Sequence, residues 1–415
     1  MADEQVPRDA DQAAEQAADR SADTSEPRGE PTTRRRRGRR LARITGRALF
    51  ALLSAGVLAI TAAGWTALDR LSGEVSSAEV LTETPDAPPA DDGATDLLLV
   101  GNDSRTDAQG EPLPLDVLRE LRTESTSGLN TDTLVLLRVP HDGAQPTAVS
   151  LPRDTSVAMP GGTQKINAVY GLAKAAAARR DSGSGADAER RAQLAGQRAL
   201  VQSVQGLAGV RVDRYAEVNL LGFYEVTDAL GGVEVCLNQA TSDKDSGADF
   251  AAGRQTISGG DALAFVRQRH GLPRGDLDRI VRQQVFMAAV ANKLLSTGTL
   301  TDPAKLAGLQ DAARRSVVLD QSWDVTGFAA QMQGLASGSV RFVTLPVRSV
   351  GDRDEHGQSV VKVDPAQVHD FIAGLVPTAG VVGRPALDLD GTARHQGEAP
   401  APSGPITSAG IPCVN

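Results

Sequence analysis

Short apolar runs and longer helical patterns alternate along most of this 415-residue chain, and that alternation predicts an α/β fold. We expect a three-layer α-β-α sandwich, in which helices cover both faces of a mixed central sheet. Hydrophobic residues make up 40% of the chain, which is enough to bury a sizeable core. One longer apolar run near the N-terminus predicts a single transmembrane helix ahead of the sandwich.

The N-terminal region contains the segments that predict membrane attachment. Residues 1–30 are rich in Ala, Asp, Glu and Gln, which is typical of a disordered tail. Residues 34–47 are rich in arginine without one acid, and residues 48–68 carry no charge over about the length of a bilayer. An arginine block could bind nucleic acid, but its position against an apolar span favours a topogenic signal. We therefore expect no nucleic-acid partner, a cytoplasmic region at 1–47 and an anchor at 48–68.

The orientation of the anchor follows from the same charges. Positive residues stay on the cytoplasmic side, so we expect a single-pass membrane protein whose residues after Asp69 are extracytoplasmic. A cleaved signal peptide is the alternative, because Ala62-Ala63-Gly64 resembles a cleavage site, but the apolar run is longer than in such signals. Residues 69–94 are polar and contain several prolines, which predicts a spacer.

The folded domain is expected at residues 95–380. Its predicted strands are residues 96–101, 133–139, 147–151, 214–218, 233–237, 262–267 and 340–346. Its predicted helices are residues 186–207, 220–230, 278–295, 325–335 and 365–375. The charged loop at 106–129 is either a flap beside the active site or a tolerated insertion. Residues 381–415 form a low-complexity tail.

The segment from Ala264 to Gln284 gives the clearest indication of function. Arg267 and Arg269 lie two apart in the strand that we expect there, so both guanidiniums would project from one face. Guanidiniums bind phosphate oxygens bidentately and stay charged, so this pair predicts an anion site. The alternative is a solvated basic patch paired with the acids that follow.

A helix is expected directly after a Gly- and Pro-containing turn. Asp276 or Asp278 would cap this helix, and Arg279 and Gln283, four apart, would share one face. The positive end of the helix dipole would join the arginines in a pocket suited to phosphate.

Two carboxylates follow the ends of predicted strands. Asp103 lies in Gly101-Asn-Asp-Ser-Arg105, and Asp132 lies in Asn130-Thr-Asp-Thr133. Loops at strand ends are where α/β sheets place their ligands. The carboxylates are either partners in structural ion pairs or ligands of a hard cation that also touches phosphate, and Mg²⁺ would fit the second reading.

Further polar residues lie near other strand ends. Arg153 and Asp154 follow a strand in Ser150-Leu-Pro-Arg-Asp154, and Lys165 and Asn167 form another donor cluster that surface decoration would also explain. The chain's five histidines show no zinc-type spacing.

The chain has two cysteines, Cys236 in a predicted strand and Cys413 near the C-terminus. In an oxidising compartment they would pair, and the bridge would tie down the C-terminal tail. Two unrelated thiols are the alternative.

An ordered series of short motifs resembles the LytR-CpsA-Psr family of cell-wall ligases. The series is Gly-x-Asp-Ser-Arg, Thr-Asp-Thr, Ser-Leu-Pro-Arg-Asp, Lys-Ile-Asn-Ala-x-Tyr, Gly-Gly-Val-x-Val, and Val-Arg-x-Arg followed by Gly-Asp-Leu-Asp-Arg and Arg-Gln. The resemblance runs from Asp96 to Leu295 and more weakly to Val376. The final Ile411-Pro-Cys-Val-Asn415 is similar to the actinobacterial branch.

The resemblance implies an α-β-α sandwich with a deep apolar pocket for a polyprenyl chain. Members transfer a phosphate-linked glycopolymer from a polyprenyl-pyrophosphate carrier to peptidoglycan, so the implied partners are that lipid-linked polymer, a peptidoglycan acceptor and membrane lipid. Transferred to this sequence, the resemblance implies that Asp103 and Asp132 hold Mg²⁺ or Mn²⁺ and that one of them acts as a base. It implies a pyrophosphate clamp made by Arg153, Lys165, Arg267, Arg269, Asp276, Arg279 and Gln283.

The implied lipid pocket would be lined by aliphatic residues, which agrees with an aromatic content of only 3%. Candidate lining residues are Leu220, Phe223, Val285, Phe286 and Val290. Two other functions remain open for the same site. One is a hydrolase in which water replaces the acceptor hydroxyl, and the other is a non-catalytic membrane regulator that binds wall precursors. A binder needs the arginines but not the two aspartates.

Overall fold

The computed structural model describes residues 76–81, 87–123, 130–294, 296–300, 302–321, 323–324, 340–376, 406–407 and 412–415. The predicted tail and anchor at 1–68 and the predicted helix at 325–335 lie outside the described residues. Across those that are described, we find no helix with the length and apolar character needed to cross a membrane.

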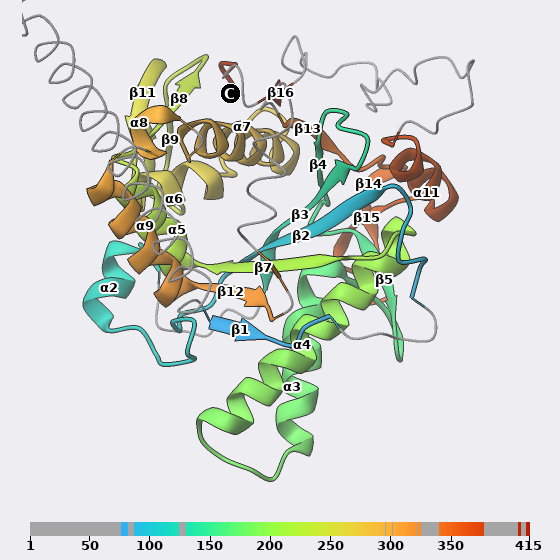
Figure 1. Cartoon of the computed structure of the whole chain (residues 1–415). Helices are drawn as coiled ribbons and strands as arrows, with labels where there is room; N and C mark the ends of the chain where they lie inside the picture. Colours follow the sequence, from blue (N-terminus) through green and yellow to red (C-terminus); the bar gives the residue numbers. More distant parts are fainter. Residues whose placement is uncertain are drawn as a thin grey trace, which may run out of the picture. The chain divides into compact units, whose positions relative to one another are not determined.

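A mixed eight-stranded sheet forms the centre of the domain (Figure 1). Its strands, in spatial order, are β1 (Ser76–Ala78), β12 (Val317–Asp320), β7 (Arg214–Asn219), β2 (Ala94–Asn102), β3 (Thr131–Pro140), β4 (Thr147–Ser150), β13 (Arg341–Thr344) and β16 (Ile406–Thr407). The pairs β1–β12, β7–β2 and β4–β13 are parallel, and the other neighbours are antiparallel. The predicted mixed sheet is confirmed.

Helices cover both faces of this sheet because its central strands are apolar on both sides (Figure 1). Leu98 and Val100 of β2 pack with α3 (Ile166–Arg180), α4 (Ala186–Ala208) and α11 (Pro365–Ala373). Leu97 and Leu99 point to the opposite face, into a core shared with α5 (Leu220–Ala229), α6 (Gly259–Arg267) and α7 (Asp276–Leu294). Helix α9 (Pro303–Ser316) packs against α5.

The strand predicted at 262–267 is wrong, because these residues belong to helix α6. The run Ala262 to Val266 is apolar throughout, and a short apolar run fits a buried helix as well as a buried strand. Its Ala and Leu residues favour helix, and all of Ala262, Leu263, Ala264 and Phe265 are buried. Arg267 therefore ends a helix and Gln268, with φ −54° and ψ 135°, leaves the helical conformation, so strand alternation does not relate Arg267 to Arg269.

Smaller elements surround the main sheet. Strand β8 (Val233–Leu237) was predicted, but it pairs with β11 (Gly253–Ile257) outside the main sheet. The other hairpins are β5 (Ser156–Met159) with β6 (Gly162–Lys165), β9 (Thr241–Asp243) with β10 (Ala248–Phe250), and β14 (Ser349–Arg353) with β15 (Ser359–Lys362). Short helices are α2 (Leu115–Glu120), within the loop at 106–129, and α8 (Thr297–Leu300).

The C-terminal residues are part of the folded domain. Cys236 and Cys413 form a disulfide, as predicted. Val414 N donates to Cys236 O at 2.9 Å, and Asn238 N donates to Val414 O at 2.8 Å, so the end of the chain runs beside β8. The prediction that Cys413 alone could hold the tail is too narrow, because β16 also adds to the main sheet.

Candidate active site

The site begins where β2 ends and β3 starts. These strands are antiparallel with Asn102 opposite Thr131, so the residues that follow and precede them are neighbours. Asp103 N donates to Asn130 O at 3.1 Å, which fixes this junction. The two predicted carboxylates, Asp103 and Asp132, are therefore brought to one edge of the sheet, as expected from their position at strand ends.

Arginines surround both carboxylates. Arg105 Nη1 lies 3.1 Å from Asp103 Oδ2, and Arg267 Nη2 lies 3.5 Å from Asp103 Oδ1. Arg153 Nη1 lies 2.9 Å from Asp132 Oδ1. Arg105, the last residue of the Gly-x-Asp-Ser-Arg motif, is a site residue that the sequence prediction missed, and its position two residues after Asp103 is the signal that could have identified it.

The charges of this group are mutually dependent. Burial raises the pKa of Asp103, the neighbouring Asp132 raises it further, and Arg105 and Arg267 oppose both effects. Burial also lowers the pKa of Arg267, while Asp103 and Asp132 counteract that lowering. Each charge is therefore favoured by its oppositely charged neighbours and disfavoured by like charges and by loss of water, so an additional anion or cation would interact strongly with the group.

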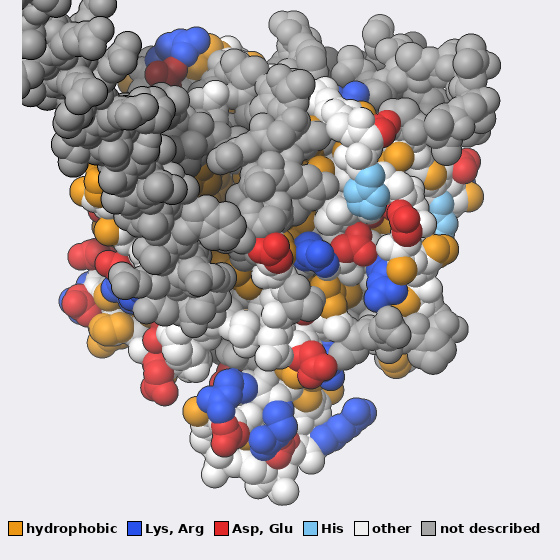
Figure 2. Space-filling view, in the orientation of Figure 1, with side chains coloured by type: hydrophobic (Ala, Val, Ile, Leu, Met, Phe, Trp, Pro, Cys, Tyr) orange, Lys and Arg blue, Asp and Glu red, His pale blue; other side chains and the backbone are white. Residues whose placement is uncertain are grey.

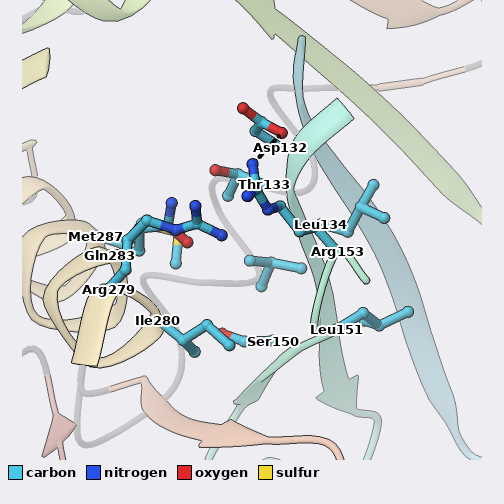
Figure 3. A pocket seen from close by; sticks show the side chains of 11 residues that line it. Asp132, Thr133, Leu134, Ser150, Leu151, Arg153, Arg279, Ile280, Gln283 and Met287 are labelled. Carbon is cyan, nitrogen blue, oxygen red and sulfur yellow. Dashed lines mark hydrogen bonds and ion pairs between the residues drawn. The ribbon is translucent and has the colours of Figure 1, made fainter. Parts of the chain in front are cut away.

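A pocket opens between the sheet edge and helix α7 (Figure 3). One wall is formed by Asp132, Arg153 and neighbouring residues of β3 and β4, and Arg279 and Gln283 approach from the helix. Arg279 and Gln283 share a face of α7, as their four-residue spacing predicted. Three of the predicted clamp residues, Arg153, Arg279 and Gln283, thus line one pocket together with Asp132.

The segment at 267–275 joins α6 to α7, and we call it the arginine turn. Arg267 Nη1 donates to Leu121 O at 3.0 Å, so the loop at 106–129 supplies a contact to the site. The main-chain nitrogen of Arg269 donates to Asp243 Oδ2 at 3.3 Å. Asp278 does not serve as the predicted cap: its carboxylate accepts from Arg274 N at 2.9 Å and pairs with the Arg274 guanidinium at 2.7 Å. The side chain of Asp276 lies outside the described residues.

Lys165 is next to the site but does not line the pocket. Its Nζ lies 3.0 Å from Asp154 Oδ1, and Asp154 Oδ2 lies 3.8 Å from Arg153 Nε. Asn167 N donates to Arg153 O at 3.1 Å. Asp154, Lys165 and Asn167 therefore position Arg153, whose guanidinium contacts Asp132.

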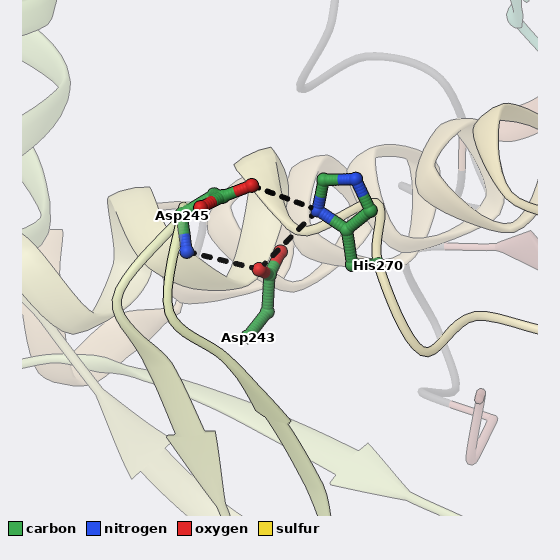
Figure 4. A group of neighbouring side chains, drawn as sticks. All are labelled: Asp243, Asp245 and His270. Carbon is green, nitrogen blue, oxygen red and sulfur yellow. Dashed lines mark hydrogen bonds and ion pairs between the residues drawn. The ribbon is translucent and has the colours of Figure 1, made fainter.

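A second polar group lies beside the arginine turn (Figure 4). His270 Nδ1 is 3.1 Å from Asp245 Oδ2 and 3.5 Å from Asp243 Oδ1. Burial alone would raise the pKa of Asp243, but hydrogen bonds from main-chain amides and from the Ser246 hydroxyl hold it below its usual value. Sequence spacing did not reveal this group, because its members come from a hairpin and from the turn after α6.

The candidate lipid-pocket residues lie in the core around α5 and α7. Val285 and Phe286 are fully buried, and Phe223 stacks on Phe286 with ring centroids 5.1 Å apart. Val290 packs against the same core, whereas Leu220 lies in a small cluster with Leu121 and Leu263. Lipid binding at these residues stays a prediction.

The family of the protein is decided by comparison with known sequences. The model of the LytR_cpsA_psr family matches residues 66–375. The chain belongs to the LytR-CpsA-Psr family. The resemblance that its ordered motifs indicated is therefore confirmed over most of the sequence.

Named relatives of this LytR-CpsA-Psr protein support the assignment. The cell wall biosynthesis protein LcpA of Corynebacterium glutamicum is 50% identical over 333 residues, which are 78% of this chain and 64% of that protein. The polyisoprenyl-teichoic acid–peptidoglycan teichoic acid transferase TagU of Bacillus cereus is 30% identical over 198 residues, 47% of this chain and 57% of that protein. The chain thus spans less than two thirds of the length of these relatives.

A solved structure shows the same fold. The LytR-Csp2A-Psr enzyme from Actinomyces oris matches with a TM-score of 0.51 at 19% sequence identity, and the match covers 72% of this chain and 95% of that chain. The mixed central sheet flanked by helices is therefore a fold that this LytR-CpsA-Psr protein shares with a known member.

Proposed function

We propose that this protein is a membrane-anchored, extracytoplasmic phosphotransferase that moves a phosphate-linked glycopolymer from a polyprenyl-pyrophosphate carrier to peptidoglycan. The observation that carries the proposal is the convergence of Asp103 and Asp132 with Arg105, Arg153 and Arg267 at one sheet edge, beside a pocket that Arg279 also lines. Clustered guanidiniums suit a diphosphate, and phosphoryl transfer depends on positioning and charge neutralisation more than on a strong nucleophile.

The reaction forms and breaks one phosphorus–oxygen bond. An acceptor hydroxyl oxygen attacks the phosphorus that bears the glycopolymer, and the bond from that phosphorus to the bridging oxygen breaks. Polyprenyl monophosphate leaves, and the hydroxyl proton passes to a base. A carboxylate at the mouth of the pocket suits that base, and the Asp132 side chain, 42% exposed, is open to an incoming acceptor.

The arginines would hold the two phosphates. Arg153 and Arg279 face each other across the pocket, so a diphosphate between them would meet donors on both sides (Figure 3). Arg267, next to Asp103, would stabilise the charge that develops on the leaving phosphate. Lys165 would act indirectly, by holding Asp154 beside Arg153.

The two carboxylates also fit a divalent cation. Mg²⁺ and Mn²⁺ prefer oxygen ligands, and Mg²⁺ is commonly held by one or two carboxylates together with substrate phosphates. Asp103 and Asp132 provide that donor set at adjoining strand ends. When bound, the ion would neutralise charge on the phosphate oxygens.

The N-terminal sequence and the relatives support the proposed location and partners. An arginine block followed by an uncharged apolar span supports a single-pass anchor with the domain outside the cytoplasm, where lipid-linked wall precursors are presented. The name of the Bacillus cereus relative states a polyisoprenyl-linked donor and a peptidoglycan acceptor, which supports the same classes of partner here.

Replacing the carboxylates tests this function. We expect Asp103→Asn and Asp132→Asn each to lower transfer from a polyprenyl-pyrophosphate-linked saccharide by about 100-fold or more, since each removes a charge that the reaction uses. Asp249→Asn, at an exposed position on β10, serves as the control. Full transfer activity in both site variants would overturn the proposal. Loss of turnover with binding of the lipid diphosphate retained would separate an enzyme from a regulator.

A further inference from the structure

Gln268 occupies the start of the arginine turn, and its side chain is fully buried. Its amide oxygen accepts a hydrogen bond from Arg282 Nη1 at 2.6 Å. Its amide nitrogen donates to Thr241 Oγ1 at 2.5 Å and to His270 O at 3.0 Å. One side chain therefore joins helix α7, strand β9 and the turn itself.

Arg282 is the partner of Gln268 on α7, and it is also fully buried. Its guanidinium lies over the ring of Phe265 in α6, with Cζ 5.0 Å from the ring centroid. Its Nε donates to Asn415 O at 2.5 Å, two residues after the disulfide-linked Cys413. Burial lowers the pKa of Arg282 to about 10, so the group remains charged at neutral pH. Arg282 thus links α6, α7 and the C-terminal segment.

This arrangement is poorly suited to stability alone. In the part of the chain that the structure describes, Arg282 Nη2 is buried without a hydrogen-bond partner. A buried guanidinium with an unsatisfied nitrogen stabilises a core less than a well-packed apolar side chain of similar volume. What the guanidinium provides, and an apolar side chain would not, is a directed hydrogen bond to Gln268.

Arg282 does not act on a ligand directly. The α7 residues that line the described pocket are Arg279, Ile280, Gln283 and Met287. Arg282 contacts instead the residue that separates Arg267 from Arg269. Its effect on the site must therefore pass through the arginine turn.

The backbone of the arginine turn contains two glycines with positive φ and is held by hydrogen bonds from both sides. Gly271 and Gly275 have φ angles of 80° and 55°, in the left-handed region that glycine enters easily. Asp243 holds the main chain at Arg269 from the side of the β9–β10 hairpin. The bond from Arg282 to Gln268 holds the same segment from the side of α7.

We propose that Arg282 and Gln268 are positioning residues for the pyrophosphate clamp: together they fix the arginine turn so that Arg267 and Arg269 are preorganised for a diphosphate. This inference rests on the proposed function, because it assumes that these arginines bind that group. Preorganised donors bind and stabilise charge better than donors that must be ordered on binding.

The test uses the full chain and inorganic pyrophosphate as the probe. Arg282→Lys keeps the charge but loses the planar fork, so it cannot bond Gln268 and Asn415 in the same way. Arg138→Lys is the matched control. Arg138 is also buried, its guanidinium pairs with both Asp96 and Asp92, and it lies near the end of β3 that is away from the site. We expect both variants to melt at lower temperature. Only Arg282→Lys should weaken pyrophosphate binding, by about tenfold, when measured well below the melting temperature.

A second variant keeps the inference testable if Arg282→Lys fails to fold. Gln268→Asn retains the amide but is shorter by one methylene, and we expect a similar loss of pyrophosphate affinity. Because the two residues act through one another, the double variant should lose about as much affinity as the weaker-binding single variant. Losses that multiply in the double variant would contradict the coupling.

The outcomes separate this inference from the proposed function. Wild-type affinity in both Arg282→Lys and Gln268→Asn would overturn the positioning role and leave the clamp intact. Equal loss in Arg138→Lys would also overturn it, because the effect would then be a general response to destabilisation. A wild-type protein that does not bind pyrophosphate would overturn both the clamp and this inference.

Discussion

Asp103 and Asp132 contact neighbouring arginines, yet their surroundings differ. The Asp103 side chain is 23% exposed and lies between Arg105 and Arg267, whereas that of Asp132 is 42% exposed and pairs with Arg153. An enclosed carboxylate between two guanidiniums suits a fixed structural charge, and a more open one suits exchange of a proton with an acceptor. The positions of both were predictable from strand ends, but their difference in exposure was not, because it depends on how Arg105, Arg267 and the described part of the loop, to Thr123, pack around Asp103.

Another carboxyl, Asp96, lies near the beginning of β2 and away from the site. It is buried beside Arg138, and burial raises the pKa of Asp96 to about 7 although the guanidinium opposes this. An acid whose pKa is higher in the folded state binds its proton more tightly there. Its contribution to stability is therefore complete at low pH and is lost as the pH rises from about 4 to about 7.

We expect the free energy of unfolding of the wild-type protein to fall over that pH range by more than that of Asp96→Asn. Urea unfolding at pH 4.5, 6 and 7.5 would measure how the free energy of unfolding of each protein changes with pH, with the exposed Asp249→Asn as control. Equal slopes in wild type and Asp96→Asn would show that Asp96 does not titrate in this window.

At the scale of elements, α3 and α4 pack closely because of a glycine. A Cβ at Gly196 in α4 would lie 2.8 Å from Tyr170 O in α3, which is closer than such atoms approach. Gly206, in the same helix, has nothing within 4 Å of the corresponding position. The sequence does not distinguish the two glycines, and their environments differ only because α3 crosses α4 at Gly196.

We expect Gly196→Ala to destabilise the domain by about 1–3 kcal/mol, because the helices must move apart. Gly206→Ala should stabilise it by up to about 1 kcal/mol, because alanine favours helix more than glycine does. Denaturant midpoints of the two variants would check this pair. A stabilising effect of Gly196→Ala would mean that the α3–α4 contact is looser than the structure has it.

Sequence patterns do not always distinguish a helix from a strand. The strands from 96 to 151 were found because each is apolar, short and bounded by polar turns. The run from Ala262 to Val266 shares those properties but forms α6, and periodicity over five residues does not distinguish the two. The prediction that Arg267 and Arg269 serve one site assumed a strand at 262–267, and helix α6 removes that geometric reason. The remaining structural evidence is the contact of Arg267 with Asp103.

At the scale of the whole molecule, the site is built from segments far apart in the sequence. The end of β2, the start of β3, the loop after β4, the end of α6 and helix α7 all contribute residues to it. The motifs predicted these residues individually, and the resemblance to a family predicted that they form one site. The contacts that hold them, such as Arg282 with Gln268 and with the C-terminal segment, depend on long-range packing that no local pattern reveals.

The central claim is that the chain transfers a phosphate-linked glycan and does not merely bind or hydrolyse its carrier. The most direct measurement supplies the full chain with a polyprenyl-pyrophosphate-linked saccharide, peptidoglycan and Mg²⁺, and identifies the products by mass spectrometry. We expect polyprenyl monophosphate and, in equal amount, the saccharide joined to peptidoglycan through a phosphodiester. Free saccharide phosphate without the phosphodiester would indicate a hydrolase, and an unchanged donor would indicate a binding protein; either result would contradict the account.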